Sequence, residues 1–255
     1  VYKFYEDIVP PLKDGEVYFC SLSCRQKWMK DFGITAIRKG SSEMFERKII
    51  RETDWNKFIR TFRKYEANDG AYTFDDGSPM PNEGMGIYWN INPSNMVKAT
   101  SEFAQKMIRS LAEVSLGQGS SMDYIKHLDR EIMSCLHHAT GSRHYIDIDV
   151  DMAKGKKFTV EGHAGLSRVL EDLKGRGVKF ALIDTRSGYH ILMKRETIKL
   201  DYTGYLKTVL DANREVFDDL MTNHNRMIPL PGALQGGYPV RVIYDLSNFE
   251  GALYD

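Results

Sequence analysis

The sequence predicts an α+β domain, close in character to the α/β class. Three observations carry this expectation. Several segments repeat apolar residues at helical spacing, others alternate apolar and polar residues as a half-buried strand does, and Gly- or Pro-rich turns separate the two kinds. Strands that alternate with helices in this way must bury their apolar faces against those helices.

Composition limits the classes of protein and compartment. The chain has 255 residues, enough for one large domain or two small ones, and its 35 Lys and Arg balance its 35 Asp and Glu. No overall positive field therefore indicates a nucleic-acid partner, although a local basic region would be hidden in that sum. The cysteines, Cys20, Cys24 and Cys135, do not suggest a disulfide framework, so we expect a reducing compartment, cytoplasmic or nucleoid-associated. No apolar run approaches the roughly 20 residues that cross a bilayer, and no membrane partner is expected.

The first third of the chain predicts an N-terminal accessory region. Residues 21–33 and 53–66 show helical spacing, and residues 67–84 are rich in Gly, Pro, Asn and Asp. We therefore expect a mostly helical accessory region over residues 1–83, followed by the main domain over residues 84–255.

The sequence of the expected main domain predicts a regular succession of strands and helices. A strand at 84–94 precedes two helices, and an acidic strand precedes a third helix, a β-hairpin and a fourth helix. The expected helices cover 95–114, 120–139, 164–177 and 202–220, and the expected hairpin strands cover 178–184 and 189–194. The acidic strand, its helix and the hairpin resemble part of a ferredoxin-like palm.

The acidic strand is the stretch YIDIDVD at 145–151. Period-two alternation places Asp147, Asp149 and Asp151 on one face, with neighbouring carboxylates about 6.6 Å apart along the backbone. Like charges at this spacing repel, and Asp is depleted in strands. A polar edge strand would tolerate the repulsion in water, whereas a divalent-cation site would cancel it.

The hairpin contributes the second pattern, SGYH at 187–190. Gly188 allows the backbone to turn tightly, and the strand then places His190 on one face. If this hairpin neighbours the acidic strand, Ser187 and His190 lie near Asp147 and Asp149. A hydroxyl, an imidazole and turn N–H groups are suitable donors to phosphate oxygens.

Together with a third stretch, DDLMTNHNRMIPLPGALQGG at 218–237, these patterns resemble the archaeo-eukaryotic primase superfamily, the prim-pols. That family has an acidic strand, a Ser…His hairpin and a third Asp, followed in many members by Thr and an Arg…Pro-Gly tail. The strand YWNINPS is also similar to the family's strand ending in Asn-Pro-Arg, with Ser94 in place of the arginine. The resemblance covers roughly residues 84–245 and implies a primase/polymerase core with a ferredoxin-like (RRM-like) palm.

The resemblance also implies which residues act. Asp147, Asp149 and Asp218 would be the catalytic carboxylates that bind two Mg²⁺ or Mn²⁺ ions, with Asp219 and Asp245 as alternatives to Asp218. The nucleotide-binding residues would be Ser187, His190, Arg226 and Arg186. The basic loop with Lys154, Lys156 and Lys157 could add to the positive field.

The chain departs from the family pattern at two positions. Pro229 stands where the family usually has a basic residue, and Gln235 stands where it usually has His. Both family residues are thought to help hold the triphosphate, so the departures weaken the expected grip on a nucleotide.

The expected function is template-directed nucleotidyl transfer, by a DNA primase or DNA-directed polymerase that makes RNA or DNA. Its expected partners are a single-stranded DNA template, nucleoside triphosphates, and a helicase or other replication protein on the same or another chain. A nucleotide-sugar glycosyltransferase, whose Asp-x-Asp also binds a metal diphosphate, is one alternative. A palm that binds nucleic acid without catalysis is another. Zinc is not expected, because Cys20 and Cys24 lack a second ligand pair in reach.

Overall fold

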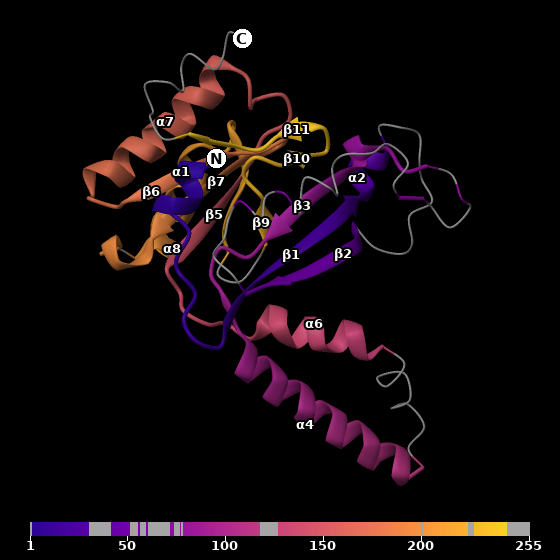
Figure 1. Ribbon diagram of the computed structural model, residues 1–255. Helices are drawn as coiled ribbons and strands as arrows, with labels where there is room; N and C mark the ends of the chain where they lie inside the picture. The colour runs from indigo at the N-terminus through magenta and orange to yellow at the C-terminus, as the bar shows by residue number, and fades with distance from the viewer. Residues whose placement is uncertain are drawn as a thin grey trace.

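The computed structural model describes residues 2–30, 42–51, 56, 60, 72–73, 77, 79–117, 127–199, 201–223 and 227–243. It is an α+β protein built on two antiparallel sheets (Figure 1). The helices are α1 (Tyr2–Asp7), α2 (Gln26–Met29), α4 (Met96–Ser115), α6 (Leu128–His138), α7 (Val160–Gly175) and α8 (Tyr202–Ala212), with 3₁₀ turns η2 (Asn82–Gly84) and η4 (Arg195–Thr197). Within the described residues, none of these helices has the length and apolar character needed to cross a bilayer.

The first sheet combines strands of the N-terminal region with short strands from residues 228–239. Its strand order is β11-β10-β3-β1-β2, with β4 paired to β1 and β9 paired to β3. The strands are β1 (Glu16–Arg25), β2 (Ser42–Ile50), β3 (Met85–Trp89), β4 (Ser94–Asn95), β9 (Ile228–Pro229), β10 (Leu234–Gln235) and β11 (Tyr238–Pro239).

This sheet corrects the expectation of a mostly helical accessory region. Residues 21–25 belong to β1, not to a helix, because β1 pairs with β2 on one side and with β3 on the other. Central strands are buried on both faces, which hides the alternation that would have marked a strand. The expected boundary at residue 84 therefore falls inside a sheet, and most of the expected helix at 53–66 lies outside the described residues.

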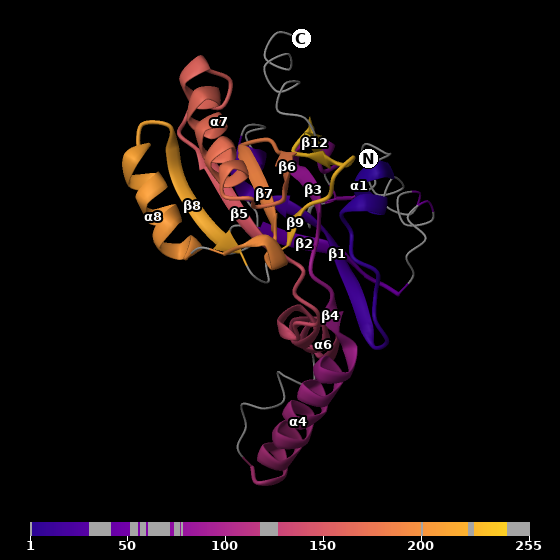
Figure 2. The same cartoon turned by 90° about the vertical axis from the view of Figure 1, so that its left-hand side faces the viewer.

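The second sheet carries the acidic strand. Its order is β12-β6-β7-β5-β8, with β5 (Tyr145–Met152), β6 (Phe180–Asp184), β7 (Gly188–Lys194), β8 (Phe217–Asn223) and β12 (Arg241–Ile243). Helices α7 and α8 cover one face of this sheet (Figure 2). The sequence predicts residues 217–220 as the end of a helix, but α8 (Tyr202–Ala212) ends earlier and the chain returns as β8 along β5. This strand pairing over a long sequence separation overrides the local helical pattern.

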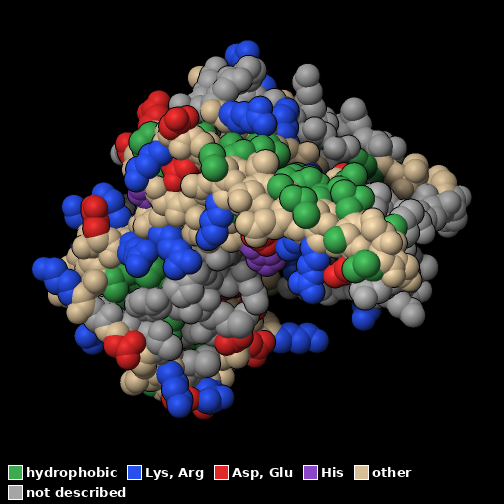
Figure 3. All heavy atoms as spheres, turned by 90° about the horizontal axis from the view of Figure 1, so that it is seen from below, with side chains coloured by type: hydrophobic (Ala, Val, Ile, Leu, Met, Phe, Trp, Pro, Cys, Tyr) green, Lys and Arg blue, Asp and Glu red, His purple; other side chains and the backbone are tan. Residues whose placement is uncertain are grey.

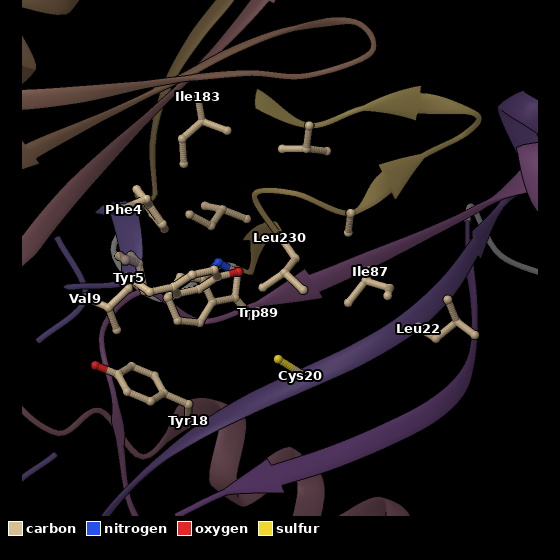
Figure 4. Close-up of a cluster of buried hydrophobic side chains, with 14 of the residues drawn as sticks. Phe4, Tyr5, Val9, Tyr18, Cys20, Leu22, Ile87, Trp89, Ile183 and Leu230 are labelled. Atoms are coloured by element: carbon tan, nitrogen blue, oxygen red, sulfur yellow. The ribbon is translucent and has the colours of Figure 1, made fainter. Parts of the chain in front are cut away.

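The two faces of β5 are fixed by what covers them. Its even-numbered residues, Ile146, Ile148, Val150 and Met152, pack with α7 and α8 in one apolar cluster. The face that carries the aspartates therefore points the other way, toward the first sheet. On that face Tyr145, Leu192, Ala181 and Ile183 pack with Trp89 and other residues of the first sheet and of α1 (Figure 4).

Helices α4 and α6 lie on the opposite face of the first sheet. They bury Ala99, Cys135 and Leu136 against Val17 and Phe19 of β1. Beyond this contact the pair projects away from the two sheets (Figures 1 and 2). Asn95 caps α4 by accepting a hydrogen bond from the Lys98 backbone N–H at 2.8 Å, as the polar residue before a helix commonly does.

The segment that runs from β3 into β4 contains Ser94, which stands where the prim-pol pattern has an arginine. The Asn92 side chain accepts hydrogen bonds from the backbone N–H groups of His144 and Tyr145 and donates to the Tyr145 carbonyl, so it ties this segment to the start of β5. Ser94 is buried and its hydroxyl accepts a hydrogen bond from Asn90 Nδ2 at 3.1 Å. A small residue at position 94 therefore suits a packed junction rather than a charged surface.

Candidate active site

The acidic face of β5 changes character along the strand. Asp147 is buried with 1% of its surface exposed, while the side chain of Asp149 is 28% exposed and Asp151 is half-buried. The apolar contact between the two sheets begins beside Asp147, at Leu192, which is its cross-strand partner on β7. The carboxylates therefore run from the interior toward the surface at one end of the interface between the sheets.

His190 lies beside two of these carboxylates. On β7 it is directly opposite Asp149, so both side chains share the acidic face. Its Nδ1 lies 3.1 and 3.0 Å from the two carboxylate oxygens of Asp147, and its Nε2 lies 3.8 Å from Asp149 Oδ1. The sequence placed His190 close to the aspartates correctly, but in this structure its imidazole contacts the carboxylates that were expected to hold metal.

The neighbouring carboxylates determine the charge on His190. Burial by itself would lower the pKa of His190, but the ion pair and hydrogen bond with Asp147, together with Asp149 and Asp151, raise the pKa to about 9. The imidazole is therefore protonated at neutral pH. A single buried cation partly cancels the repulsion among three aspartates on one strand face.

By register, β8 adds Asp219 to this face as a further carboxylate. Asp151 pairs with Asp219, whereas the next pair is Met152 with Phe217, so the ladder has an irregularity at Asp218. Asp218 is an extra residue of the kind that forms a β-bulge, and it is exposed. Register thus places Asp219 on the acidic face and leaves the expected ligand Asp218 exposed at the irregularity, and Asp245 lies outside the described residues.

The turn between β6 and β7 brings two further expected residues to the site. Gly188 is opposite Asp151, and a Cβ atom at Gly188 would lie 1.9 Å from the Val150 carbonyl oxygen. Glycine is therefore required here by the close approach of β5. Ser187 precedes it and is half-buried, while the backbone N–H of Arg186 donates to Gln235 Oε1 at 2.8 Å.

Residues of the first sheet complete the surroundings. Gln235 Nε2 donates to the Tyr88 hydroxyl at 3.2 Å, and the Arg25 guanidinium carbon lies 5.0 Å from the centre of the Tyr88 ring. Burial is the main reason that the pKa of Tyr88 is raised, with Arg25 lowering it and Asp149 raising it further. Sequence reasoning missed Arg25 and Tyr88 because they come from β1 and β3, far along the chain from β5. Their only signal in the sequence is a basic and an aromatic residue at strand positions.

The other basic side chains that were expected to add positive charge to the site lie in different surroundings. Lys157 is buried and its ammonium lies 2.8 Å from Asp184 Oδ1, so it serves an ion pair on the other face of the sheet. Lys154 is exposed, Lys156 is half-buried, and Arg226 lies outside the described residues. On the face seen in Figure 3, Lys and Arg side chains form separate groups with acidic side chains between them.

The donor chemistry of the acidic face suits a hard cation, because carboxylate oxygens are the ligands that Mg²⁺ and Mn²⁺ prefer. The positions of these side chains do not by themselves form a complete set of metal ligands. Within the described part of the chain, no three or more His, Cys, Asp or Glu side chains are gathered closely enough to hold an ion. Both oxygens of Asp147 lie against His190. Of the cysteines, Cys20 and Cys24 are buried in the core between the two sheets, and Cys135 of α6 is buried where α4 and α6 pack on the first sheet.

Comparisons of the chain with protein-family models, with curated proteins and with solved structures found no match.

Proposed function

We propose that this chain is a template-directed nucleotidyltransferase, a primase or DNA-directed polymerase that makes RNA or DNA from nucleoside triphosphates on a single-stranded DNA template. The observation that carries the proposal is the meeting of the acidic face of β5 with His190 of the β7 hairpin, through direct contacts of 3.0 and 3.1 Å. Phosphate transfer requires carboxylates for cations and donors for phosphate oxygens at one place, and this end of the second sheet offers both.

The topology of the second sheet supports the proposed palm. The chain runs β5, α7, β6, β7, α8, β8, and these strands lie in the order β6-β7-β5-β8. This β-α-β-β-α-β succession is that of a ferredoxin-like unit. Its central strands are β5 and β7, which carry the acidic face and His190. A rigid pair of central strands is a suitable support for groups whose spacing must not change during catalysis.

Asp147, Asp149 and Asp219 are the side chains that would hold Mg²⁺ or Mn²⁺ in this proposal. When bound, the ions would supply the charge that activates a primer 3′-hydroxyl and stabilises the transferred phosphoryl group. Asp219 replaces Asp218 in this set because it shares the face of Asp151. Asp219 is opposite Asp151, so Asp149 lies between Asp147 and Asp219 along the sheet. We therefore expect Asp149 to contribute most to holding the ions.

The residues of the chain have separable tasks. Protonated His190 holds Asp147 in one orientation and presents positive charge beside Asp149. Ser187 and the backbone N–H groups of the β6–β7 turn, whose Gly188 is opposite Asp151, would donate hydrogen bonds to a phosphate in this proposal. The apolar contacts around Leu192 exclude water from the inner end of the face, which strengthens the remaining charge interactions.

The test is incorporation of labelled NTPs or dNTPs on a primed template and on an unprimed single strand, with Mg²⁺ or Mn²⁺. Asp149→Asn should reduce incorporation by about 100-fold or more, because loss of even a supporting residue at a metal site costs about 10–100-fold. Asp172→Asn is the matched control, because Asp172 lies on α7 in a surface ion pair with Arg176. Near-normal incorporation by Asp149→Asn would contradict the proposed site.

The same assay separates the two alternatives. A nucleotide-sugar glycosyltransferase would hydrolyse or transfer from a nucleotide sugar and leave the primer unextended. A palm without catalysis would bind single-stranded DNA and extend nothing with either metal.

A further inference from the structure

Two arginines, one at the end of β1 and one in the β6–β7 turn beside the acidic face, lie against aromatic rings, and the sequence patterns of the second sheet do not account for this arrangement. Arg25 is the last residue of β1 and is half-buried. Its guanidinium stacks on the Tyr88 ring, with 5.0 Å between the guanidinium carbon and the ring centre. Arg186, from the β6–β7 turn, stacks in the same way on Trp28 of α2 at 5.4 Å. Two arginines held by aromatic faces thus border the same region.

Tyr88 connects Arg25 to the turn beside the acidic face. Its phenol oxygen accepts a hydrogen bond from Gln235 Nε2 at 3.2 Å, and Gln235 Oε1 accepts one from the Arg186 backbone N–H at 2.8 Å. Arg186 is two residues before Gly188, which is opposite Asp151 on β5. Tyr88 and Gln235 therefore join Arg25 to the turn that meets the carboxylates, and a metal-bound phosphate needs anion donors next to its metal ligands.

The guanidinium of Arg25 forms no ion pair with the residues that the structure describes. Among the residues that the structure describes, no carboxylate lies within 4.0 Å of its guanidinium, although several other arginines have such a partner on the surface. A guanidinium that stacks by its face keeps its edge N–H groups for a bidentate contact, and this geometry matches a phosphate.

The two departures from the prim-pol pattern bear on the same tyrosine. Pro229 pairs with Tyr88 across β9 and β3, and Gln235 donates to the Tyr88 hydroxyl while accepting from the Arg186 N–H. The positions that lack a phosphate-binding side chain therefore support the wall on which Arg25 stacks and the turn that carries Arg186.

Gly236 shows that the Arg186 side of this wall is tightly packed. Its φ is +61°, and a Cβ atom there would lie 2.4 Å from Arg186 Nη1 and 2.9 Å from Trp28 Cδ2. Glycine is therefore needed both for the left-handed backbone and for the approach of the stacked pair.

We propose that Arg25, with Arg186, forms a phosphate-binding subsite on the first sheet, which grips the triphosphate of the nucleotide substrate in place of the missing basic residues at positions 229 and 235. This inference rests on the proposed function, because it names the part of the same site that holds the substrate's phosphates. It also gives the N-terminal region a direct part in substrate binding.

The experiment is isothermal titration of a nucleoside triphosphate, and separately of inorganic tripolyphosphate, into the parent chain and its variants with Mn²⁺. Arg25→Ala should weaken binding of both probes by about tenfold or more, the effect of losing one charge-assisted contact. Arg25→Gln, which keeps a planar polar group over Tyr88, should show a similar loss. Arg109→Ala is the control, because Arg109 is exposed on the projecting helix α4 and pairs only with Glu113 among the described residues.

A second readout separates binding from general damage. In primer extension, Arg25→Ala should raise KM for the nucleotide with a much smaller effect on kcat, as expected when a contact serves ground state and transition state alike. If the parent binds both probes and Arg25→Ala and Arg25→Gln bind them equally well, the subsite is wrong while the proposed function stands. If the parent binds neither probe, the proposed function fails and the subsite fails with it.

Discussion

The β6–β7 hairpin carries a buried ion cluster on each of its two faces, and the clusters differ in how charge is balanced. On the helix-covered face, the Lys157 ammonium pairs with Asp184 at 2.8 Å, donates to the Thr185 carbonyl and lies 4.1 Å from the centre of the Tyr238 ring. On the other face, one imidazole, His190, meets several aspartates of β5. The first cluster has one cation for one carboxylate, and the second has carboxylates in excess.

The pKa values show the consequence of that difference. Burial lowers the pKa of Lys157, and the attraction of Asp184 only partly offsets it. Burial also acts to lower the pKa of His190, but three aspartates overcome it and the pKa rises. A balanced pair that is enclosed by aromatic rings is suited to holding two segments together. An acidic excess is suited to taking up a further cation, which is why we assign function to the second cluster.

The largest expected loss of stability comes from breaking the balanced pair. Lys157→Met leaves Asp184 buried without its cation, which typically costs about 3–5 kcal/mol. The free energy of unfolding, measured by urea denaturation, checks this. Lys156→Met is the control, because Lys156 is 40% exposed and lies 4.0 Å from Glu161. If Lys157→Met is as stable as this control, the Lys157 cluster does not anchor the hairpin.

A smaller loss is expected at the inner end of the acidic face. Asp147→Asn removes the charge that His190 faces but keeps an oxygen that can accept its hydrogen bond. A hydrogen bond to a charged group contributes about 1.5–3 kcal/mol, and part of that should be lost. The pKa of His190 should fall in the variant, as followed by NMR titration of its ring. An unchanged His190 titration would show that Asp149 and Asp151 control its charge.

The free energy of unfolding should also depend on pH in metal-free buffer. The pKa of His190 is about 9 in the folded chain, above the ordinary value of about 6.5 for an unfolded one. The folded state therefore holds the proton more tightly, so this stabilisation is complete below about pH 6.5 and is lost as pH rises through about 9. His190→Gln should remove that part of the pH dependence, whereas the exposed control His138→Gln should keep it. A parent chain with no such fall in stability would mean that His190 is not protonated.

The smallest effect is expected at the outer end of the acidic face. Asp151 and Asp219 are directly opposite on β5 and β8, and like charges in such pairs destabilise by about 0.2–1 kcal/mol. Asp219→Asn should therefore leave the free energy of unfolding unchanged or raise it slightly, with a gain that shrinks at high salt. Asp218→Asn is the matched control, because Asp218 is the exposed neighbour outside this pair. A clear loss of stability in Asp219→Asn alone would show that Asp219 has a favourable partner that outweighs the repulsion.

Much of the main domain follows from the sequence because its signals are local. Alternation by itself put the aspartates of residues 145–151 on one face of a strand, and β5 confirms it with apolar residues packed under α7 and α8. Helical spacing at 95–114 corresponds to α4, and the hairpin at 178–194 corresponds to β6 and β7. These features depend on the period of side chains along one element, which the order of residues determines.

Tertiary structure decided everything that depends on register or on burial between distant segments. The choice between Asp218 and Asp219 depends on a one-residue irregularity in the ladder between β8 and β5, and a shift of one residue exchanges the faces of a strand. The sequence predicts Lys157 as a cation in a solvated loop, but its side chain is buried beside Asp184. Gln235 stands where the prim-pol pattern has a histidine, and in the structure its side chain hydrogen-bonds with both the Arg186 backbone N–H and the Tyr88 hydroxyl. Residues 16–25 form a central strand because β2 and β3 pair with them on both sides. Each of these outcomes is set by partners that are remote in sequence, so no pattern within the segment could reveal it.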